Sequence, residues 1–222
     1  VNLHLEAMKK LGADIDLKDG YIIAETKKLK GAKINFDVSS VGATGNAMMA
    51  AVLAKGTTLI NNAAIEPEIT QLADYLVKMG AQINGIGTNT LEIQGVENLH
   101  SAEITTIPDR IETGTLLIAA AITNGNITLN ETTSEHLEAV LLKLEDCGCK
   151  ISREPNKISI DARNLELNPV SITTSIFPGF PTDMQAQWTA YMSIANGVST
   201  VTDTVYLDRF MHVPELVRLG AD

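Results

Sequence analysis

Hydrophobic and polar positions along the chain follow one recurring order of helix and strand patterns. Residues 66–80 (EPEITQLADYLVKMG) are apolar at i, i+3, i+4 and i+7, which predicts an amphipathic helix that ends on a glycine. Alternating segments at residues 81–84 and 90–95 predict short strands, and we expect a third strand near residues 101–107. An uncharged, alanine-rich helix and a β-branched strand, as in residues 57–62, complete a unit that is βαβαββ-like.

Two series of glycines indicate that this unit repeats. The first closes amphipathic helix patterns at Gly12, Gly80, Gly148 and Gly220, and the second closes alanine-rich helix patterns at Gly56, Gly125 and Gly197. Within each series the glycines lie about 70 residues apart, a period typical of a repeated supersecondary unit. We therefore predict an α/β fold of repeated βαβαββ units, with its best domain boundary at Ile107–Pro108, where proline stops a strand pattern.

Polar residues stand in front of three alanine-rich helix patterns: Ser39 with Ser40, Asp109, and Thr182 with Asp183. Such residues most often cap the amides of the first helical turn. A buried helix also directs its unpaired amides, and the positive end of its dipole, towards an anion. Several helix ends that face one cleft would bind phosphate or carboxylate with little basic charge. Local chemistry therefore leaves two interpretations of Asp183 open: a helix cap, or the reactive group of an active site.

Composition places the chain among soluble globular proteins. It has 222 residues, of which 45% are hydrophobic, enough for one large domain or two small ones. No apolar run approaches the roughly 18 to 20 residues of a membrane span, and the first residues lack the order of a signal peptide, so we expect a cytoplasmic protein. The chain starts and stops in mid-pattern, and we interpret it as a fragment of a longer protein.

Charge and cysteine content narrow the function. The formal net charge of −10 and the scattered basic residues argue against a nucleic-acid surface. Cys147 and Cys149 flank one glycine, a spacing too tight for an ordinary disulfide and too sparse for zinc, and we expect no metal and no cofactor. The SSVGAT segment lacks the lysine of a P-loop, which disfavours a nucleoside-triphosphate site.

Four segments resemble signature segments of the UDP-N-acetylglucosamine enolpyruvyl transferase (MurA) family. They are SVGATGNAMMAAVLAKGTTLINNAAIEPEI, PDRIETGTLLIAAAI, FPTDMQAQ and RFMHVPEL, and the likeness runs over essentially all 222 residues in the same order. Members of that family are two-domain enzymes of the inside-out α/β barrel type, with three βαβαββ units per domain and substrates in the cleft between domains. The resemblance implies that residues 1–107 belong to the first domain and residues 108–222 to the second.

The resemblance also implies a reaction. The family transfers the enolpyruvyl group of phosphoenolpyruvate to the 3′-hydroxyl of UDP-N-acetylglucosamine and releases phosphate. This is the first committed step of peptidoglycan synthesis, and hence of cell-wall biogenesis. The addition and elimination steps need a base near the sugar hydroxyl, an acid for the methylene carbon, and cationic groups around phosphate and carboxylate.

Site residues follow from the matching motifs. Asp183 matches the carboxylate proposed to take the proton of the 3′-hydroxyl, while Arg110 and Arg209, with Thr182, match the cleft and its closure. The nucleotide-sugar contacts match Val1, Asn2, Leu3, Val38, Ser39, Ser40, Val41, Gly42 and Val205. Val38 stands where many members have lysine and Asn2 where the common pattern has aspartate, so two contacts of the family are altered here.

Two expectations follow for the isolated chain, and two alternative functions stay open. The Lys-Asn pair, the cysteine loop and a late arginine of the family lie outside these residues, so we expect the isolated chain to be inactive. Half-domains that lack strands should expose sheet edges that pair between copies. The alternative functions are a shikimate-pathway enolpyruvyl transferase, which shares the fold and the reaction type, and a non-catalytic relative that binds a nucleotide sugar or another protein.

Overall fold

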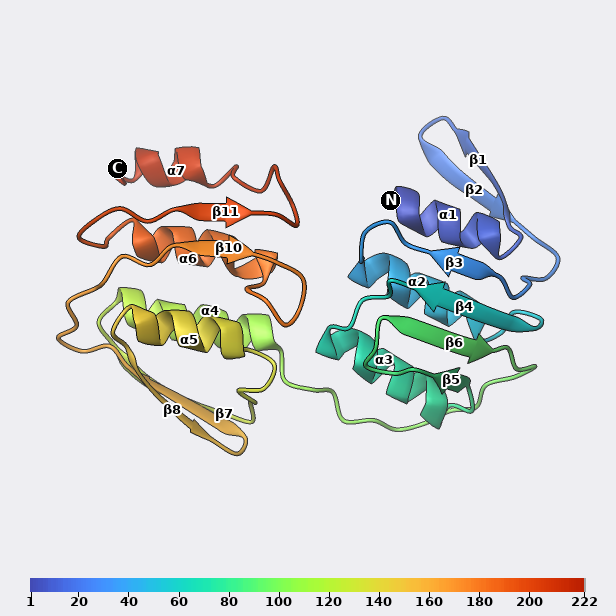
Figure 1. Ribbon diagram of the computed structural model, residues 1–222, viewed down its shortest axis with the longest axis horizontal. Helices are drawn as coiled ribbons and strands as arrows, with labels where there is room; N and C mark the ends of the chain where they lie inside the picture. Colours follow the sequence, from blue (N-terminus) through green and yellow to red (C-terminus); the bar gives the residue numbers. More distant parts are fainter. Residues whose placement is uncertain (222) are drawn as a thin grey trace. The chain divides into compact units, whose positions relative to one another are not determined.

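The chain consists of two compact units, each with a hydrophobic core of its own. The computed structural model describes residues 1–221 and divides them into Val1–Ile107 and a second unit that begins at Pro108 (Figure 1). The cores are separate clusters of buried side chains, one formed within each unit. Each unit therefore folds around its own helices and sheets.

The first unit contains one complete copy of the predicted repeat. Its elements are α1 (Asn2–Lys10), β1 (Asp14–Lys18), β2 (Tyr21–Glu25), β3 (Lys33–Asn35), α2 (Val41–Ala51), β4 (Thr57–Asn61), α3 (Pro67–Lys78), β5 (Gln82–Asn84) and β6 (Thr90–Gln94). From β3 to β6 the order is βαβαββ, as the sequence predicts. The sheet has the strand order β3-β4-β6-β5, with β3 and β4 parallel and the other pairs antiparallel. The hairpin of β1 and β2 forms a separate two-stranded sheet (Figure 1).

Helix α2 is the buried centre of this unit. It carries no charged residue, and Ala43, Ala47 and Ala51 are fully buried. Their small side chains allow close approach to α1 and α3 and to the buried face of the sheet, where Leu91 and Ile93 of β6 alternate with exposed residues. The alternation predicted for residues 90–95 thus places one sheet face in the core.

The second unit repeats the same order of helices and strands, but its copies of the repeat are incomplete. Its elements are α4 (Arg110–Ile122), β7 (Asn126–Asn130), α5 (Glu138–Asp146), β8 (Lys150–Glu154), β9 (Lys157–Asp161), β10 (Ile172–Thr174), the 3-10 helix η1 (Thr182–Met184), α6 (Gln185–Met192), β11 (Val201–Asp203) and α7 (Val213–Arg218). Strands β7, β9 and β8 form an antiparallel sheet in that order, and β10 pairs in parallel with β11.

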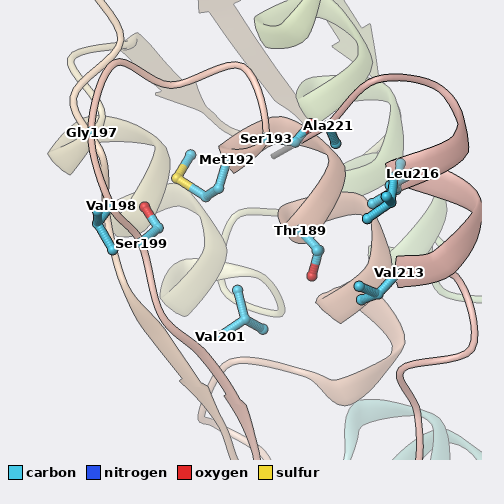
Figure 2. Close-up of a pocket in the computed structure, with 11 residues that line it drawn as sticks. Thr189, Met192, Ser193, Gly197, Val198, Ser199, Val201, Val213, Leu216 and Ala221 are labelled. Carbon is cyan, nitrogen blue, oxygen red and sulfur yellow. The ribbon is translucent and has the colours of Figure 1, made fainter.

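An apolar pocket lies between α6, β11 and α7. It has a volume of about 420 Å³ and is lined by side chains such as Thr189, Val201, Val213 and Leu216 (Figure 2). Strand β11 pairs with β10 on one edge and with no other strand of the described residues. The unit is therefore less completely packed here than around its other sheet.

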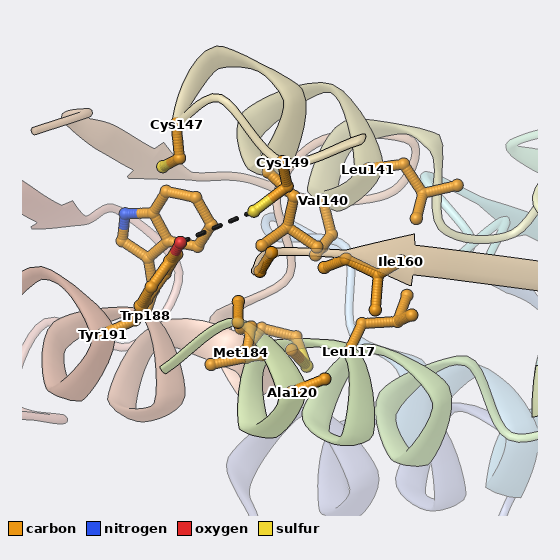
Figure 3. Close-up of a cluster of buried hydrophobic side chains, with 14 of the residues drawn as sticks. Leu117, Ala120, Val140, Leu141, Cys147, Cys149, Ile160, Met184, Trp188 and Tyr191 are labelled. Atoms are coloured by element: carbon orange, nitrogen blue, oxygen red, sulfur yellow. Dashed lines mark hydrogen bonds between the residues drawn. The ribbon is translucent and has the colours of Figure 1, made fainter. Parts of the chain in front are cut away.

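Three aromatic side chains form a cluster in the core of the second unit. Trp188 is fully buried and meets Phe180 and Tyr191 edge to face, at centroid distances of 5.4 Å and 5.9 Å. Cys149 contacts the Tyr191 hydroxyl, with 3.5 Å between sulfur and oxygen (Figure 3). Burial raises the pKa of Cys147 to about 12 and also raises the pKa of Cys149, so both remain neutral core thiols at physiological pH.

The first glycine series closes four helices with one geometry. Gly12, Gly80, Gly148 and Gly220 have φ angles of 93°, 103°, 100° and 100°. At Gly80 the next amide, Ala81 N–H, donates to the carbonyl of Leu76 at 2.9 Å, the bond of a Schellman cap. The predicted left-handed C′ glycine is therefore confirmed, together with the repeat that it marks.

Two expectations about local structure are wrong. Residues 101–107 form no strand, although they are rich in β-branched residues, because they pair with no neighbouring strand; Gln71 of α3 instead donates to the Thr105 carbonyl at 2.9 Å. Ser40 and Asp109 cap α2 and α4 as predicted, but α6 begins after η1, with Met184 at its N-cap and no side-chain cap. Asp183 is therefore not a helix cap.

Candidate functional site

In the first unit, the beginnings of α1 and α2 lie against each other. His4 Nδ1 and Asn46 Nδ2 are 2.7 Å apart and share a hydrogen bond. A Cβ built on Gly42 would lie 3.1 Å from His4 Cε1, so that a larger residue at Gly42 would crowd the imidazole. The structure thus brings Asn2 and Leu3, predicted from the start of the chain, close to the predicted segment 38–42.

The N-terminus of α2 is a polar but uncharged surface. Ser40 Oγ accepts a hydrogen bond from the Ala43 amide at 3.3 Å, and the Ser40 carbonyl accepts from Thr44. The amides of Val41 and Gly42 belong to the first turn, which has no acceptor within the helix. Val38 is 64% exposed in front of this turn. The segment offers amide donors and a positive dipole end to an anionic ligand, without a cationic side chain from residues 38–42.

In the second unit, Asp183 forms an ion pair with Arg209. Arg209 Nη1 lies 2.6 Å from Asp183 Oδ1, and the two side chains are 39% and 53% exposed. The same guanidinium lies 5.5 Å from the ring centroid of Tyr206, and its Nη1 is 3.4 Å from Thr182 Oγ1. Among the described residues, Asp183 Oδ2 has no hydrogen-bond donor. The predicted residues Thr182, Asp183 and Arg209 are therefore neighbours, with one carboxylate oxygen open to solvent.

A buried aspartate that the sequence reasoning missed lies beside this ion pair. Asp203 is 5% exposed and accepts hydrogen bonds from Thr174 and Thr182, both at 2.7 Å, and from the amides of Val205 and Tyr206. Burial alone raises the pKa of Asp203, but hydrogen bonds from Thr182, the Tyr206 amide, Thr174 and the Val205 amide together bring it below its ordinary value.

The lowered pKa sets the pH range in which Asp203 stabilises the fold. Because its pKa is lower in the folded than in the unfolded state, its contribution is present at neutral pH. That contribution is lost as the pH falls below about 4 and through the folded-state pKa. A local sequence signal for Asp203 does exist, since an aspartate after a strand commonly accepts from amides two and three residues on.

Arg110 occupies a different environment in the second unit. It is 9% exposed at the first position of α4, and its guanidinium lies 5.5 Å from the ring centroid of Phe177. It also lines a small cavity with His136 and Pro181. Its contact with Phe177 differs from the ion pair that Arg209 makes with Asp183, so the two predicted arginines lie in different surroundings.

Residues 1–221 contain neither a cluster of metal ligands nor a membrane-spanning helix. Within residues 1–221, no group of three His, Cys, Asp or Glu side chains gathers in a way that could hold a metal ion. No helix in this range combines the length and the apolar character required to cross a membrane. The apolar pocket of Figure 2 contains none of the predicted site residues.

Comparison with known proteins decides the family. The family model of EPSP synthase (3-phosphoshikimate 1-carboxyvinyltransferase) matches residues 1–222. The chain belongs to the EPSP synthase family. As a member of that family it has the repeated α/β fold that the glycine series predicts.

Curated relatives are more specific within the EPSP synthase family. UDP-N-acetylglucosamine 1-carboxyvinyltransferase of Chloroherpeton thalassium is 58% identical over 224 residues, covering 100% of this chain and 52% of that protein. The protein of the same name from Dichelobacter nodosus is 51% identical over 221 residues, with the same coverage of 100% and 52%. The chain thus spans about half the length of the curated relatives it matches.

Solved structures agree on the fold. The enolpyruvyl transferase NikO from Streptomyces tendae superposes with a TM-score of 0.87 at 24% identity, over 98% of this chain and 55% of that chain. EPSP synthase from Acinetobacter baumannii gives a TM-score of 0.68 at 18% identity, over 100% of this chain and 53% of that chain. At these identities the likeness shows that the enolpyruvyl transferase fold is shared.

Proposed function

We propose that the complete gene product containing this chain transfers the enolpyruvyl group of phosphoenolpyruvate to the 3′-hydroxyl of UDP-N-acetylglucosamine, with release of phosphate. The observation that carries the proposal is the Asp183–Arg209 pair, which joins a half-exposed carboxylate to a cation from two segments that resemble the signature segments of the family. Both substrates are intracellular phosphorylated metabolites, and we place the reaction in the cytoplasm, at the start of peptidoglycan synthesis. The two units are then parts of the first and second enolpyruvyl transferase domains.

Asp183 has the geometry of a base for the sugar hydroxyl. Its Oδ1 is held by Arg209, which fixes the carboxylate, while Oδ2 is open to accept a hydrogen bond from a bound hydroxyl. Proton acceptance by Oδ2 would increase the nucleophilicity of the 3′-oxygen towards the central carbon of the enolpyruvyl group. Arg209 then serves a second purpose, because the guanidinium that orients Asp183 also offers positive charge to phosphate or carboxylate groups.

The nucleotide sugar is assigned to the beginning of α2. Ser39, Ser40, Val41 and Gly42 supply amides and hydroxyls at the positive end of a buried helix, a suitable environment for a diphosphate. Val38, with Val1, Asn2 and Leu3 from the start of α1, completes the assignment on this unit. Val205 and Arg110 on the second unit are assigned to substrate contact. Because the family resemblance puts Val38 where many members have lysine, we expect a weaker dependence of binding on salt.

The identity of the acceptor is tested by calorimetric titration of the complete gene product. We expect UDP-N-acetylglucosamine to bind and shikimate 3-phosphate to give no saturable heat, because the α2 segment is uncharged and suits a nucleotide sugar better than a small anionic ring. Saturable binding of shikimate 3-phosphate with none of the nucleotide sugar would assign the protein to the shikimate-pathway reaction. Binding of the nucleotide sugar without turnover would favour a non-catalytic relative.

We further propose that copies of this chain associate through unpaired sheet edges. Among the described strands, β2 pairs only with β1, and β11 pairs only with β10. In the complete copy of the repeat, β6 occupies the position of β2 and β4 the position of β11, and there the two strands pair with each other. Leu17, Tyr21 and Ile22 on the hairpin are exposed apolar residues. An exposed apolar edge strand is a template for pairing with another chain. In this arrangement, β2 of one copy lies antiparallel on β11 of another.

Light scattering coupled to gel filtration tests this association. We expect the mass to rise above that of a monomer as concentration increases, and the exposed-edge variant Ile22→Lys to shift the chain towards monomer. The control is Val77→Lys, which places the same charge at a comparably exposed apolar position on α3. A strict monomer at high concentration, or an equal effect of both variants, would count against pairing through β2.

A further inference from the structure

Asp203 makes more hydrogen bonds than any other carboxylate near the Asp183–Arg209 pair. Its Oδ1 accepts from the Thr174 hydroxyl at 2.7 Å and from the amides of Val205 and Tyr206 at 2.9 Å and 2.8 Å. Its Oδ2 accepts from the Thr182 hydroxyl at 2.7 Å. The two oxygens thus have different partners: Oδ1 holds the turn that follows β11, and Oδ2 holds the residue directly before Asp183.

The Oδ2 contact leads to Asp183 through Thr182 and Arg209. Thr182 donates its proton to Asp203 and can therefore accept from Arg209, whose Nη1 lies 3.4 Å away. Arg209 in turn holds Asp183. Asp203, Thr182, Arg209 and Asp183 form a continuous polar chain, in which a buried anion fixes the direction of the Thr182 hydroxyl.

The Oδ1 contacts shape the segment that carries Val205 and Tyr206. Their amides converge on one oxygen, and these two hydrogen bonds stabilise the conformation of the turn. Tyr206 places its ring against the Arg209 guanidinium, with 5.5 Å between the guanidinium carbon and the ring centroid. The same carboxylate therefore organises both the segment assigned to the nucleotide sugar and one contact of Arg209.

We propose that Asp203 is a positioning residue of the transferase site, which aligns Asp183 through Thr182 and presents Val205 through the turn after β11. The proposal rests on the proposed function of Asp183 and deepens it. Asp203 itself is buried and touches no substrate, so its contribution is geometric. A displacement of about 1 Å at a reacting group can lower turnover about 100-fold, which makes this positioning measurable.

The two oxygens can be tested separately because asparagine resembles aspartate in shape. In Asp203→Asn, the amide oxygen keeps the Oδ1 bonds to the turn, while the NH₂ group replaces Oδ2 and donates to Thr182. The Thr182 hydroxyl is then reversed and the negative charge is lost. We expect kcat to fall about 10- to 100-fold with little change in KM for UDP-N-acetylglucosamine. Asp203→Ala removes both sets of bonds and should also raise that KM about 10-fold.

The matched control is Asp208→Asn, the same substitution at an exposed position five residues along the segment that follows β11. We expect this variant to keep the wild-type kcat and KM. Thr182→Val provides a second route that leaves Asp203 intact and removes only the hydroxyl. If Asp203 acts through Thr182, the Asp203→Asn/Thr182→Val double variant should lose no more kcat than the more impaired single variant.

These measurements distinguish a positioning role of Asp203 from a purely structural one. If Asp203 had a purely structural role, Asp203→Asn would lower thermal stability and the fraction of active protein, but the folded variant would keep the wild-type kcat per active site. That result would overturn the proposal. If Asp203→Asn does not fold, a wild-type kcat for Thr182→Val would overturn it equally. Absence of UDP-N-acetylglucosamine-dependent phosphate release by the wild type would instead reject the proposed function.

Discussion

Replacing Asp183 with alanine is expected to lower turnover of the complete gene product about 10²- to 10⁴-fold while binding of UDP-N-acetylglucosamine is largely kept. This is the range that a general base contributes. The reason is that the proposed function has Asp183 Oδ2 accept the hydroxyl proton, while it assigns binding of the nucleotide to the beginning of α2. Steady-state phosphate release gives kcat, and calorimetric titration gives the affinity.

The variant Asp183→Asn distinguishes the role of Asp183 as a base from its contact with Arg209. The asparagine carbonyl can still accept from Arg209, so the ion pair is replaced by a neutral hydrogen bond, yet no carboxylate remains to take a proton. We expect Asp183→Asn to be nearly as inactive as Asp183→Ala. An asparagine variant with wild-type kcat would show that Asp183 orients substrate without acting as a base. An alanine variant that lost affinity and turnover equally would show the same.

Trp188→Ala is expected to destabilise the second unit by about 3 to 5 kcal/mol, the range for removing a large buried aromatic side chain. Trp188 is the only tryptophan, is fully buried, packs edge to face on Phe180 and Tyr191, and donates its Nε1–H to the Val170 carbonyl at 3.1 Å. Because the cores are separate, residues 1–107 should be unaffected. Hydrogen exchange of backbone amides, resolved by peptide, measures both units in one sample.

Trp188→Phe is the matched control for this substitution. Phenylalanine keeps an aromatic ring in the core but removes the donor to Val170, so we expect a loss of about 1 to 3 kcal/mol, smaller than for alanine. Equal loss of protection in both units after Trp188→Ala would contradict the independence of the cores. Unchanged protection of residues 108–221 would contradict the central place of Trp188 in that core.

Much of the fold could be predicted because its signals are local. The glycines that end the amphipathic helices, the capping residues Ser40 and Asp109, and the alternation of residues 90–95 each depend on neighbours within one helix turn or one strand. The repeat then combined these signals into the βαβαββ unit found from β3 to β6. Family resemblance, borne out by the match over residues 1–222, added the enolpyruvyl transferase fold.

The predictions that failed, and the residue that was missed, depend on contacts between residues distant in the sequence. Residues 101–107 have strand-like composition, but a strand requires a partner edge, and composition does not reveal its absence. Asp183 precedes a buried helix, yet it lies within the 3-10 helix η1 and contacts Arg209, 26 residues away, instead of capping α6. Asp203 was missed for the same reason, since its burial and its bonds to Thr174 and Thr182 arise only when β10 and β11 pair.

We propose that the site built around Asp183 serves enolpyruvyl transfer to a nucleotide sugar. The most direct measurement is phosphate release by the complete gene product with phosphoenolpyruvate and either UDP-N-acetylglucosamine or shikimate 3-phosphate, with the product identified by mass spectrometry. We expect phosphate and an enolpyruvyl adduct with UDP-N-acetylglucosamine, and neither with shikimate 3-phosphate. An adduct formed only with shikimate 3-phosphate, or no adduct with either acceptor, would overturn the proposed function.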